Sequence, residues 1–126
     1  MIAIISCTKS KYQGKNNVAR QVYWKSNLFR LSYAVIKKLH PDAEIHILSA
    51  KYGLIKETQI IDSYEKTVKD MSKEEKEAFK QTIDCPKEYI FIGGSEYKKV
   101  LLYEPTIEYG TGLPIGKKMA HLKKLL

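Results

Sequence analysis

The chain has few cysteines, no long apolar run and no acidic residue among its first 41 positions. Two cysteines in 126 residues cannot supply the disulfide framework of a small secreted domain. No apolar run approaches the roughly 18 residues that a bilayer span requires. The opening apolar segment, residues 2–5, is too short for a signal-peptide core and has no basic residue before it. We therefore expect a cytoplasmic protein that does not engage a membrane.

The missing acids leave the first third of the chain strongly basic. Residues 1–41 hold eight basic side chains, whereas the rest of the chain holds 14 basic and 14 acidic ones. A one-sided charge of this kind attracts phosphates, either of nucleotides or of nucleic acid. Twenty of the 22 basic residues are Lys, which disfavours bidentate reading of bases by Arg. We expect a phosphate-bearing partner; a lysine-rich surface that only aids solubility is the alternative.

Four β-rich runs alternate with helical stretches, and this pattern predicts one α/β domain over residues 1–126. We expect a short, mainly parallel sheet of about four strands with helices on both faces. The expected strands are 2–5, 44–48, 88–92 and 106–109, the first three mutually parallel. The expected helices are 27–40, capped by Asn27, 72–83, opened by a Ser72 capping box, a short one ending near 101, and 115–125.

Two segments, 6–26 and 49–71, are predicted to be mainly loop. Compact domains rarely keep loops of about twenty residues without a functional reason. Both segments follow the C-terminal end of a predicted strand, where open α/β sheets bind their ligands. Cys7 and Cys85 fall at opposite edges of such a sheet, roughly 15 Å apart, so we expect two free thiols in a reducing compartment.

The first candidate site follows the first strand and consists of Ser6, Thr8, Lys9, Ser10 and Lys11. Three hydroxyls, two ammonium groups and the free N–H groups of a turn suit an anionic ligand. The segment lacks the glycines of a Walker phosphate loop. The alternative is that the hydroxyls only complete the turn and that the lysines are solvated.

The second candidate site follows the second strand and contains Ser49, Lys51 and Tyr52, with Gly53 turning the chain. Lys51 suits a phosphate, and the Tyr52 ring suits stacking on a base. A tyrosine packed over an ordinary turn is the alternative. Gly93 and Gly94 end the third strand near Tyr97 and allow the backbone to approach a ligand closely, although a plain tight turn explains them almost as well.

Downstream of the second site, residues 62–71 supply candidate acids and Tyr64, which can pack against a base. A carboxylate over the strand ends could orient water or stabilise an oxocarbenium-like centre, which makes Asp62 the candidate catalytic residue. His40, His46 and His121 have no ligand-like neighbours, so we expect neither a metal nor another cofactor. Cys7 as a nucleophile lacks a histidine placed as its base.

Four motifs together resemble a family of small domains found in bacteria, archaea and phages. They are residues 4–11 (IISCTKSK), 48–54 (LSAKYGL), 64–67 (YEKT) and 112–116 (GLPIG). The layout of that family is similar to the uracil-DNA-glycosylase-like α/β fold, and the resemblance implies work on nucleotides or nucleobases. Our leading hypothesis is an enzyme that cleaves or transfers at an N-glycosidic bond. The alternative is a non-catalytic module that binds nucleotides or nucleic acid through the same residues.

Overall fold

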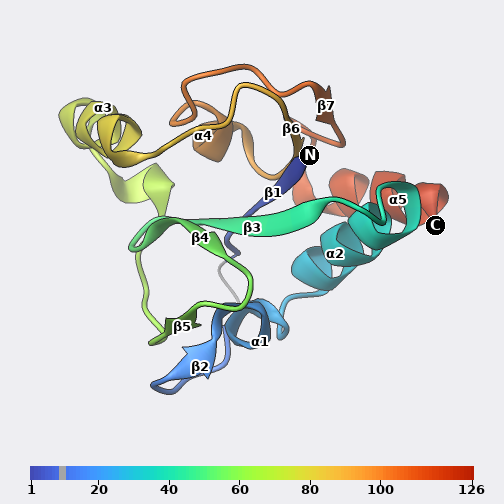
Figure 1. Cartoon of the computed structure of the whole chain (residues 1–126), viewed down its shortest axis with the longest axis horizontal. Coiled ribbons are helices and arrows are strands. Elements are labelled where there is room, and N and C mark those ends of the chain that lie inside the picture. Colours follow the sequence, from blue (N-terminus) through green and yellow to red (C-terminus); the bar gives the residue numbers. More distant parts are fainter. Residues whose placement is uncertain (9–10) are drawn as a thin grey trace.

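Five strands form one sheet in the order β4-β3-β1-β6-β7, seen in the computed structural model of the chain (Figure 1). The structure describes residues 1–8 and 11–126, so the candidate ligand residues Lys9 and Ser10 lie outside the described part. The central strand β1 (Ile2–Ser6) pairs in parallel with both β3 (Glu44–Ser49) and β6 (Tyr89–Ile92). The short β7 (Ile107–Glu108) continues the parallel set beyond β6. The prediction of a mainly parallel α/β sheet is confirmed.

The fifth strand of this sheet, β4 (Gly53–Lys56), was predicted to be loop, and that prediction was wrong. It pairs antiparallel with β3, so that Ser49 faces Gly53 across the turn. Gly53 has a φ of +78°, a conformation that glycine adopts at little cost and that lets the chain reverse within a few residues. The apolar residues of β4 are too few to show a strand period, so the sequence pattern could not reveal this pairing.

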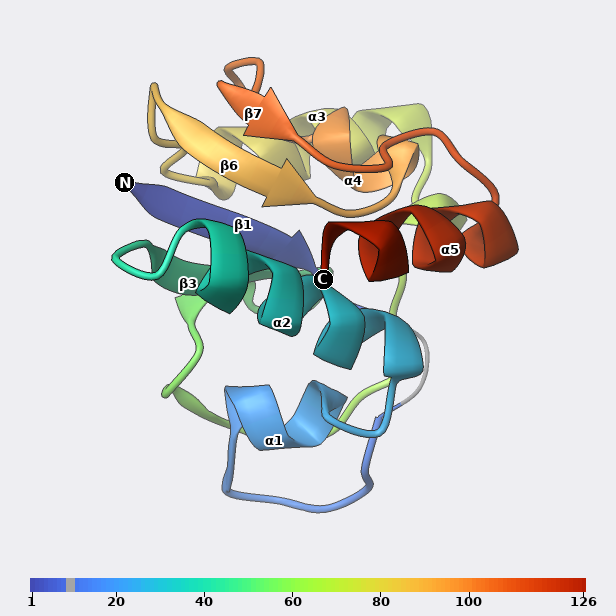
Figure 2. The same ribbon diagram turned by 90° about the vertical axis from the view of Figure 1, so that its right-hand side faces the viewer.

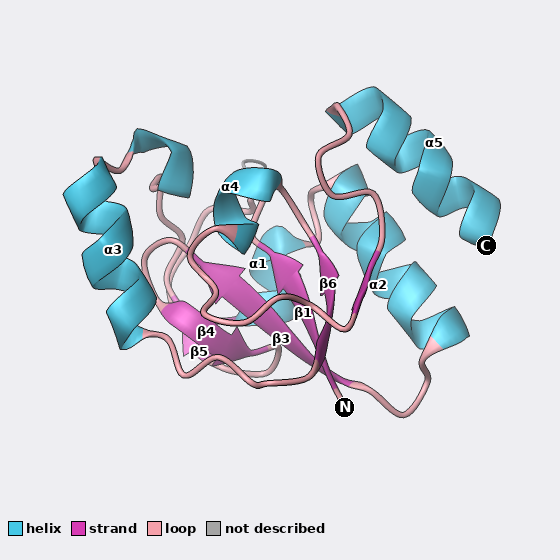
Figure 3. Ribbon diagram, turned by 90° about the horizontal axis from the view of Figure 1, so that it is seen from above, coloured by secondary structure: helices cyan, strands magenta, loops and turns pink. Residues whose placement is uncertain are grey.

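Helices cover both faces of the sheet, as expected. One face carries α2 (Asn27–Leu39) and α5 (Ile115–Leu125), which pack against each other, and the other carries α3 (Lys73–Thr82) and α4 (Ser95–Lys98) (Figures 2 and 3). Among the described residues, none of these helices is both long enough and apolar enough to cross a bilayer.

Two of the helix starts test the capping predictions. The capping box at Ser72 is confirmed, because Ser72 Oγ accepts from Glu75 N at 3.1 Å and Glu75 Oε1 accepts from Ser72 N at 3.3 Å. The predicted cap at Asn27 is wrong by one position: Ser26 Oγ accepts from Phe29 N at 3.1 Å, and Asn27 is the first helical residue. Both side chains can cap a helix, so composition alone did not distinguish them.

The segments predicted to be mainly loop contain further short elements. Residues 6–26 include β2 (Asn17–Val18) and α1 (Ala19–Tyr23), and residues 49–71 include β5 (Ile60–Ile61) and the 3₁₀ helix η1 (Val68–Asp70). β2 pairs antiparallel with β5, which fastens the first long segment to the second. The prediction that both segments are mainly loop missed this pairing, because it is non-local and only two residues long on each side.

The core consists of isoleucines and aromatic residues of β1, β3 and β6 packed against one face of α2. Ile4, Ile47 and Phe91 are fully buried. Cys7 and Cys85 are both buried, and both are free thiols, as predicted.

The turn after β6 generates the first testable prediction. A Cβ at Gly93 would lie 2.4 Å from Ser6 Oγ and 2.7 Å from Phe91 Cζ, so Gly93→Ala should destabilise the protein by about 1–3 kcal/mol through overpacking. Gly116 of α5 meets nothing within 4 Å, so Gly116→Ala is the matched control and should leave stability equal or slightly higher. Urea unfolding measures both changes. Equal midpoints for Gly93→Ala and the parent would show that the turn tolerates a side chain.

Candidate functional site

Buried polar side chains gather where the parallel strands end. We name Ser6, Cys7, Lys11, Ser49, Tyr64 and Tyr97 the strand-end cluster; each is less than a tenth exposed. Parallel pairing places Ser6 beside Leu48 and Ile5 beside Ile92, so the segments that follow β1, β3 and β6 emerge at one edge of the sheet. The structure therefore brings together residues from the first, second and third strand-end segments of the sequence.

A chain of hydroxyl groups runs through one side of this cluster. Ser49 Oγ donates to Tyr64 Oη at 2.6 Å, and the Tyr64 and Tyr23 hydroxyls are hydrogen-bonded to each other. Ser49 Oγ also accepts from the backbone N–H of Tyr52 at 3.0 Å, which fixes the turn after β3. Burial raises the pKa of both Tyr23 and Tyr64 above the usual phenol value. Both phenols therefore stay protonated and can donate hydrogen bonds.

Lys11 lies against the rings of these two tyrosines and is only 7% exposed. Its Nζ is 4.8 Å from the ring centroid of Tyr64 and 5.9 Å from that of Tyr23, within the range of a cation–π interaction. Burial lowers the pKa of Lys11, while the charges of Cys7 and Glu65 act in the opposite direction. The Lys11 amine thus has a lowered pKa, feels the charge of a carboxylate and lies over two aromatic rings. Such an amine is suited to proton transfer.

The other side of the cluster connects β1 to the turn after β6. Cys7 Sγ and Tyr97 Oη are 2.9 Å apart and share a hydrogen bond. Tyr97 Oη lies 3.5 Å from Thr67 Oγ1 and accepts from Val68 N at 3.5 Å. The sequence pattern marks Tyr97 only as part of a turn, and it does not mark Tyr23 at all. Both reach the cluster through contacts between distant segments, for which the sequence contains no local signal.

Gly93 and Gly94 bring their backbone to the same edge. Gly94 N donates to Ser6 Oγ at 3.3 Å, and the Gly93 carbonyl accepts from Lys118 Nζ at 2.9 Å. Lys118, from α5, is buried at 6% exposure and was not among the candidates predicted from the sequence. Because α5 is rich in lysine, its sequence does not show which lysine side chain points inward.

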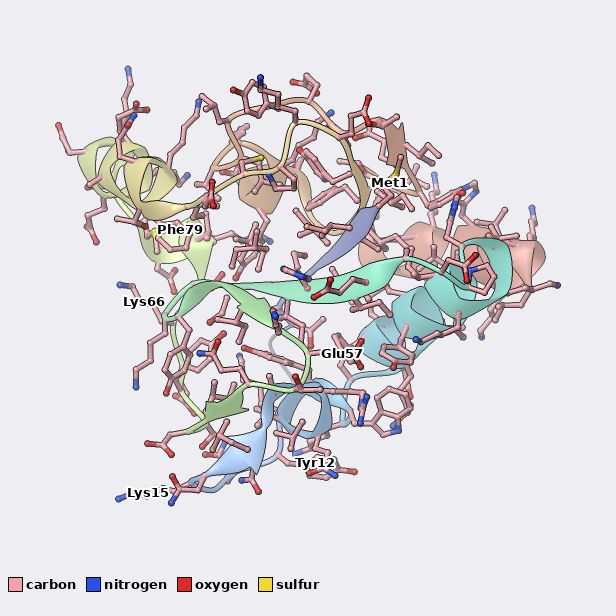
Figure 4. The ribbon with its side chains drawn as sticks, viewed as in Figure 1. Met1, Tyr12, Lys15, Glu57, Lys66 and Phe79 are labelled. Carbon is pink, nitrogen blue, oxygen red and sulfur yellow. The ribbon has the colours of Figure 1, made fainter. Side chains whose placement is uncertain are left out.

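Lys51 and Tyr52 line a groove instead of joining the strand-end cluster. This groove, which we name the β3–α3 groove, has a volume of about 700 Å³ and runs between the β3–β4 turn and α3. Figure 4 labels two of its lining residues, Lys66 and Phe79. Lys51 Nζ is 5.2 Å from the centroid of the Tyr52 ring, and that ring meets the Tyr64 ring edge-on at 5.7 Å. Tyr52 thus separates the groove from the cluster.

The candidate catalytic residue Asp62 has a hydrogen-bonding role in the loop pairing. Asp62 Oδ1 accepts from the backbone N–H of Asn16 at 2.9 Å, and Asn16 has a φ of +56°. The backbone N–H of Asp62 donates to Tyr52 Oη at 3.1 Å. Glu65, three residues further along, is the carboxylate whose charge acts on Lys11. Sequence position alone did not distinguish these two acids.

His46, for which the sequence suggests no role, lines the β3–α3 groove together with Asp84. His46 Nε2 lies 3.1 Å from Glu44 Oε1, whereas His40 Nε2 lies 2.7 Å from Tyr109 Oη outside the groove. Within residues 1–8 and 11–126, no three His, Cys, Asp or Glu side chains are grouped as metal ligands would be.

The chain of hydroxyl groups predicts that two conservative Tyr→Phe substitutions will change stability by different amounts. Tyr64→Phe would remove the acceptor of the buried Ser49 hydroxyl proton and the hydrogen-bond partner of the buried Tyr23 hydroxyl. Leaving buried polar groups unpaired should cost about 1–3 kcal/mol. Tyr12→Phe, at a side chain that is 53% exposed, is the matched control and should change stability by less than about 0.5 kcal/mol. Thermal unfolding that is the same for both variants would contradict the described hydroxyl chain.

Comparison with known families gives one match, to a model described as a family of unknown function (DUF6884), over residues 2–124. No curated protein and no solved structure matches the chain. The matched span includes every strand of the sheet, the described residues of the strand-end cluster and the β3–α3 groove. The chain belongs to the family of unknown function DUF6884.

Proposed function

We propose that the protein is a nucleotide- or nucleobase-directed enzyme that cleaves or transfers at an N-glycosidic bond. The observation that carries the proposal is the buried Lys11 amine, which lies over the Tyr64 ring at the C-terminal edge of a parallel sheet. Ligands of open α/β sheets bind at that edge. The sequence motifs resemble a family of small domains whose layout is similar to the uracil-DNA-glycosylase-like fold, and this supports the same substrate class.

The burial of so many polar groups supports a ligand site at the strand-end cluster. Removing an ammonium group from water is costly unless other groups compensate, and a small domain has little stability in reserve. Aromatic rings beside a buried cation suit a nucleobase, because the base can stack on the rings and accept a hydrogen bond from the amine. Tyr64 and Lys11 provide these two contacts in the proposed complex.

The chemistry assigns separate roles to Lys11 and Glu65. As the N-glycosidic bond breaks, the nucleobase leaves with the bonding electron pair and takes a proton from the Lys11 ammonium. Water adds to the sugar carbon, its proton passing to the Glu65 carboxylate, which also stabilises the oxocarbenium-like centre. The lowered pKa of Lys11 makes it a better acid for this step. Asp62 would then position the loop through Asn16.

A non-catalytic module is the second candidate, and the β3–α3 groove favours it. Lys51 and Lys66 supply positive charge there, and Tyr52 and Phe79 supply aromatic surface. Basic residues combined with aromatic rings bind single-stranded nucleic acid with little dependence on sequence. In this alternative the groove binds the single-stranded nucleic acid, and the strand-end cluster only stabilises the fold.

We also propose a cytoplasmic location. Both cysteines are free and buried. A thiol hydrogen-bonded to Tyr97, as at Cys7, is maintained more readily in a reducing compartment than in an oxidising one.

The enzyme proposal is tested by incubating the protein with a panel of nucleosides and nucleotides and measuring the free base by chromatography. Glu65→Gln should reduce the release of base by at least about 100-fold, as expected for loss of a general base, while ligand binding persists. Lys11→Met should reduce both release and binding, and Lys15→Met, at an exposed site, is its control. Absence of free base from every substrate with the parent protein would reject the enzyme and leave the binding module.

The groove alternative is tested with a fluorescently labelled single-stranded oligonucleotide. Lys51→Ala and Lys66→Ala should each weaken binding and lower the salt dependence by roughly 0.7 logarithmic units for each phosphate that the variant no longer binds. Lys73→Ala, an exposed lysine of α3 that does not line the groove, is the matched control. If all three variants bind like the parent at every salt concentration, the groove does not hold nucleic acid.

A further inference from the structure

Lys118 is a buried cation that the reaction described above does not use. It comes from the N-terminal part of α5 and reaches the edge where β1 and β6 end. Its side chain is 6% exposed, and its Nζ donates to the Gly93 carbonyl at 2.9 Å. Among the residues that the structure describes, no carboxylate forms an ion pair with it. A neutral carbonyl compensates only part of the cost of burying a full positive charge.

The surroundings of Lys118 contain hydroxyl groups among apolar side chains and enclose a small space. Lys118 lines a cavity of about 10 Å³ together with the hydroxyl-bearing residues Ser6, Thr8 and Ser32. That volume is close to the minimum for one water-sized oxygen atom. Ser6 Oγ accepts from Gly94 N at 3.3 Å, so its proton remains available to an oxygen atom in the cavity, whereas the Ser32 hydroxyl proton is already donated to the Leu28 carbonyl at 2.8 Å. The cavity is therefore shaped for a single oxygen atom that meets an ammonium group and hydroxyls.

Two further observations favour an anion beside Lys118. Burial lowers the pKa of Lys118, and the positive charge of Lys69 acts in the same direction. Thr111 Oγ1 is buried and has no hydrogen-bond partner within the described part of the chain. Its neighbour Gly110 packs on Lys118, since a Cβ there would lie 3.1 Å from Lys118 Cγ. A buried ammonium group that also feels a second positive charge is better accommodated with an anion beside it.

We propose that Lys118, with the hydroxyls of Ser6 and Thr8, binds one oxygen of the phosphate group of the ligand. The inference rests on the proposed function and deepens it, because it divides the edge of the sheet into two subsites. The phosphate lies at the β1–β6–α5 end, and the nucleobase lies at the Lys11–Tyr64 end. The final helix thereby contributes to the site, although no motif in it indicates this.

The test replaces Lys118 by methionine, which keeps most of the side-chain length and removes the charge. Lys117→Met is the matched control, because Lys117 is the exposed neighbour on the same helix. Each protein is titrated with inorganic phosphate, with a nucleoside and with its 5′-monophosphate, using calorimetry and thermal shift. Lys118→Met should lose at least tenfold in affinity for phosphate and for the monophosphate while its affinity for the nucleoside stays unchanged. Lys117→Met should bind all three like the parent.

A second variant keeps the test independent of the folding of Lys118→Met. Ser6→Ala removes one donor hydroxyl of the cavity and should weaken phosphate binding severalfold without affecting the nucleoside. Phosphate affinity that is unchanged in both variants, or a parent protein that binds nucleoside and monophosphate equally, would overturn the phosphate subsite and leave the proposed function standing. Phosphate binding that depends on Lys118, with neither nucleoside nor monophosphate bound more tightly than phosphate, would support the subsite and reject the nucleotide proposal.

Discussion

The parallel pairing of β1 with both β3 and β6 is the constraint on which the candidate site depends. In this register, Ser6 lies beside Leu48 and Ile5 beside Ile92, so three segments leave the sheet at one edge. Were either neighbour antiparallel, its following segment would emerge at the opposite edge. Lys11, Ser49 and Tyr97 would then lie on different ends of the molecule. The turn after β6 adds two hydrogen bonds at the same edge. The Gly93 carbonyl accepts from Lys118 Nζ, and the Gly94 amide donates to Ser6 Oγ.

The cost of burying polar groups at this edge is met mainly by hydrogen bonds between segments distant in the sequence. Ser49 donates to Tyr64, the Tyr64 hydroxyl pairs with that of Tyr23, and Cys7 pairs with Tyr97. Each bond contributes about 1 kcal/mol net, yet leaving one partner unpaired costs more. Such a network holds its members in one arrangement, which is what a binding site requires. Lys118 brings to the same edge a full positive charge that its hydrogen bond to the Gly93 carbonyl offsets only in part.

Local patterns allowed much of the fold to be predicted from the sequence, but little of the way in which the site is assembled. The Ser72 capping box and the run of isoleucines in β1 act within a few residues, so the sequence displays them directly. β4 and the β2–β5 pair depend on contacts across the fold and were missed. The same holds for Tyr23 and Lys118, whose local surroundings resemble those of other aromatic and basic residues. Lys51 and Tyr52 were predicted as part of a second site after β3, and the antiparallel turn into β4 directs them to the groove.

The fold brings together the two segments of the chain that contain no acidic residues. Basic and acidic residues are equal in number over residues 42–126, yet residues 109–126 contain four lysines and no acid. Residues 1–41 likewise contain no acid. The packing of α5 on α2 brings these two acid-free ends of the chain together. Lys11 and Lys118 then enter the strand-end region from opposite ends of the sequence, and acidic residues such as Glu65 come from between them. Cations that converge on a buried edge repel one another, and a bound phosphate would turn that repulsion into attraction. The absence of acids at both ends of the chain fits the phosphate-bearing ligand that we propose.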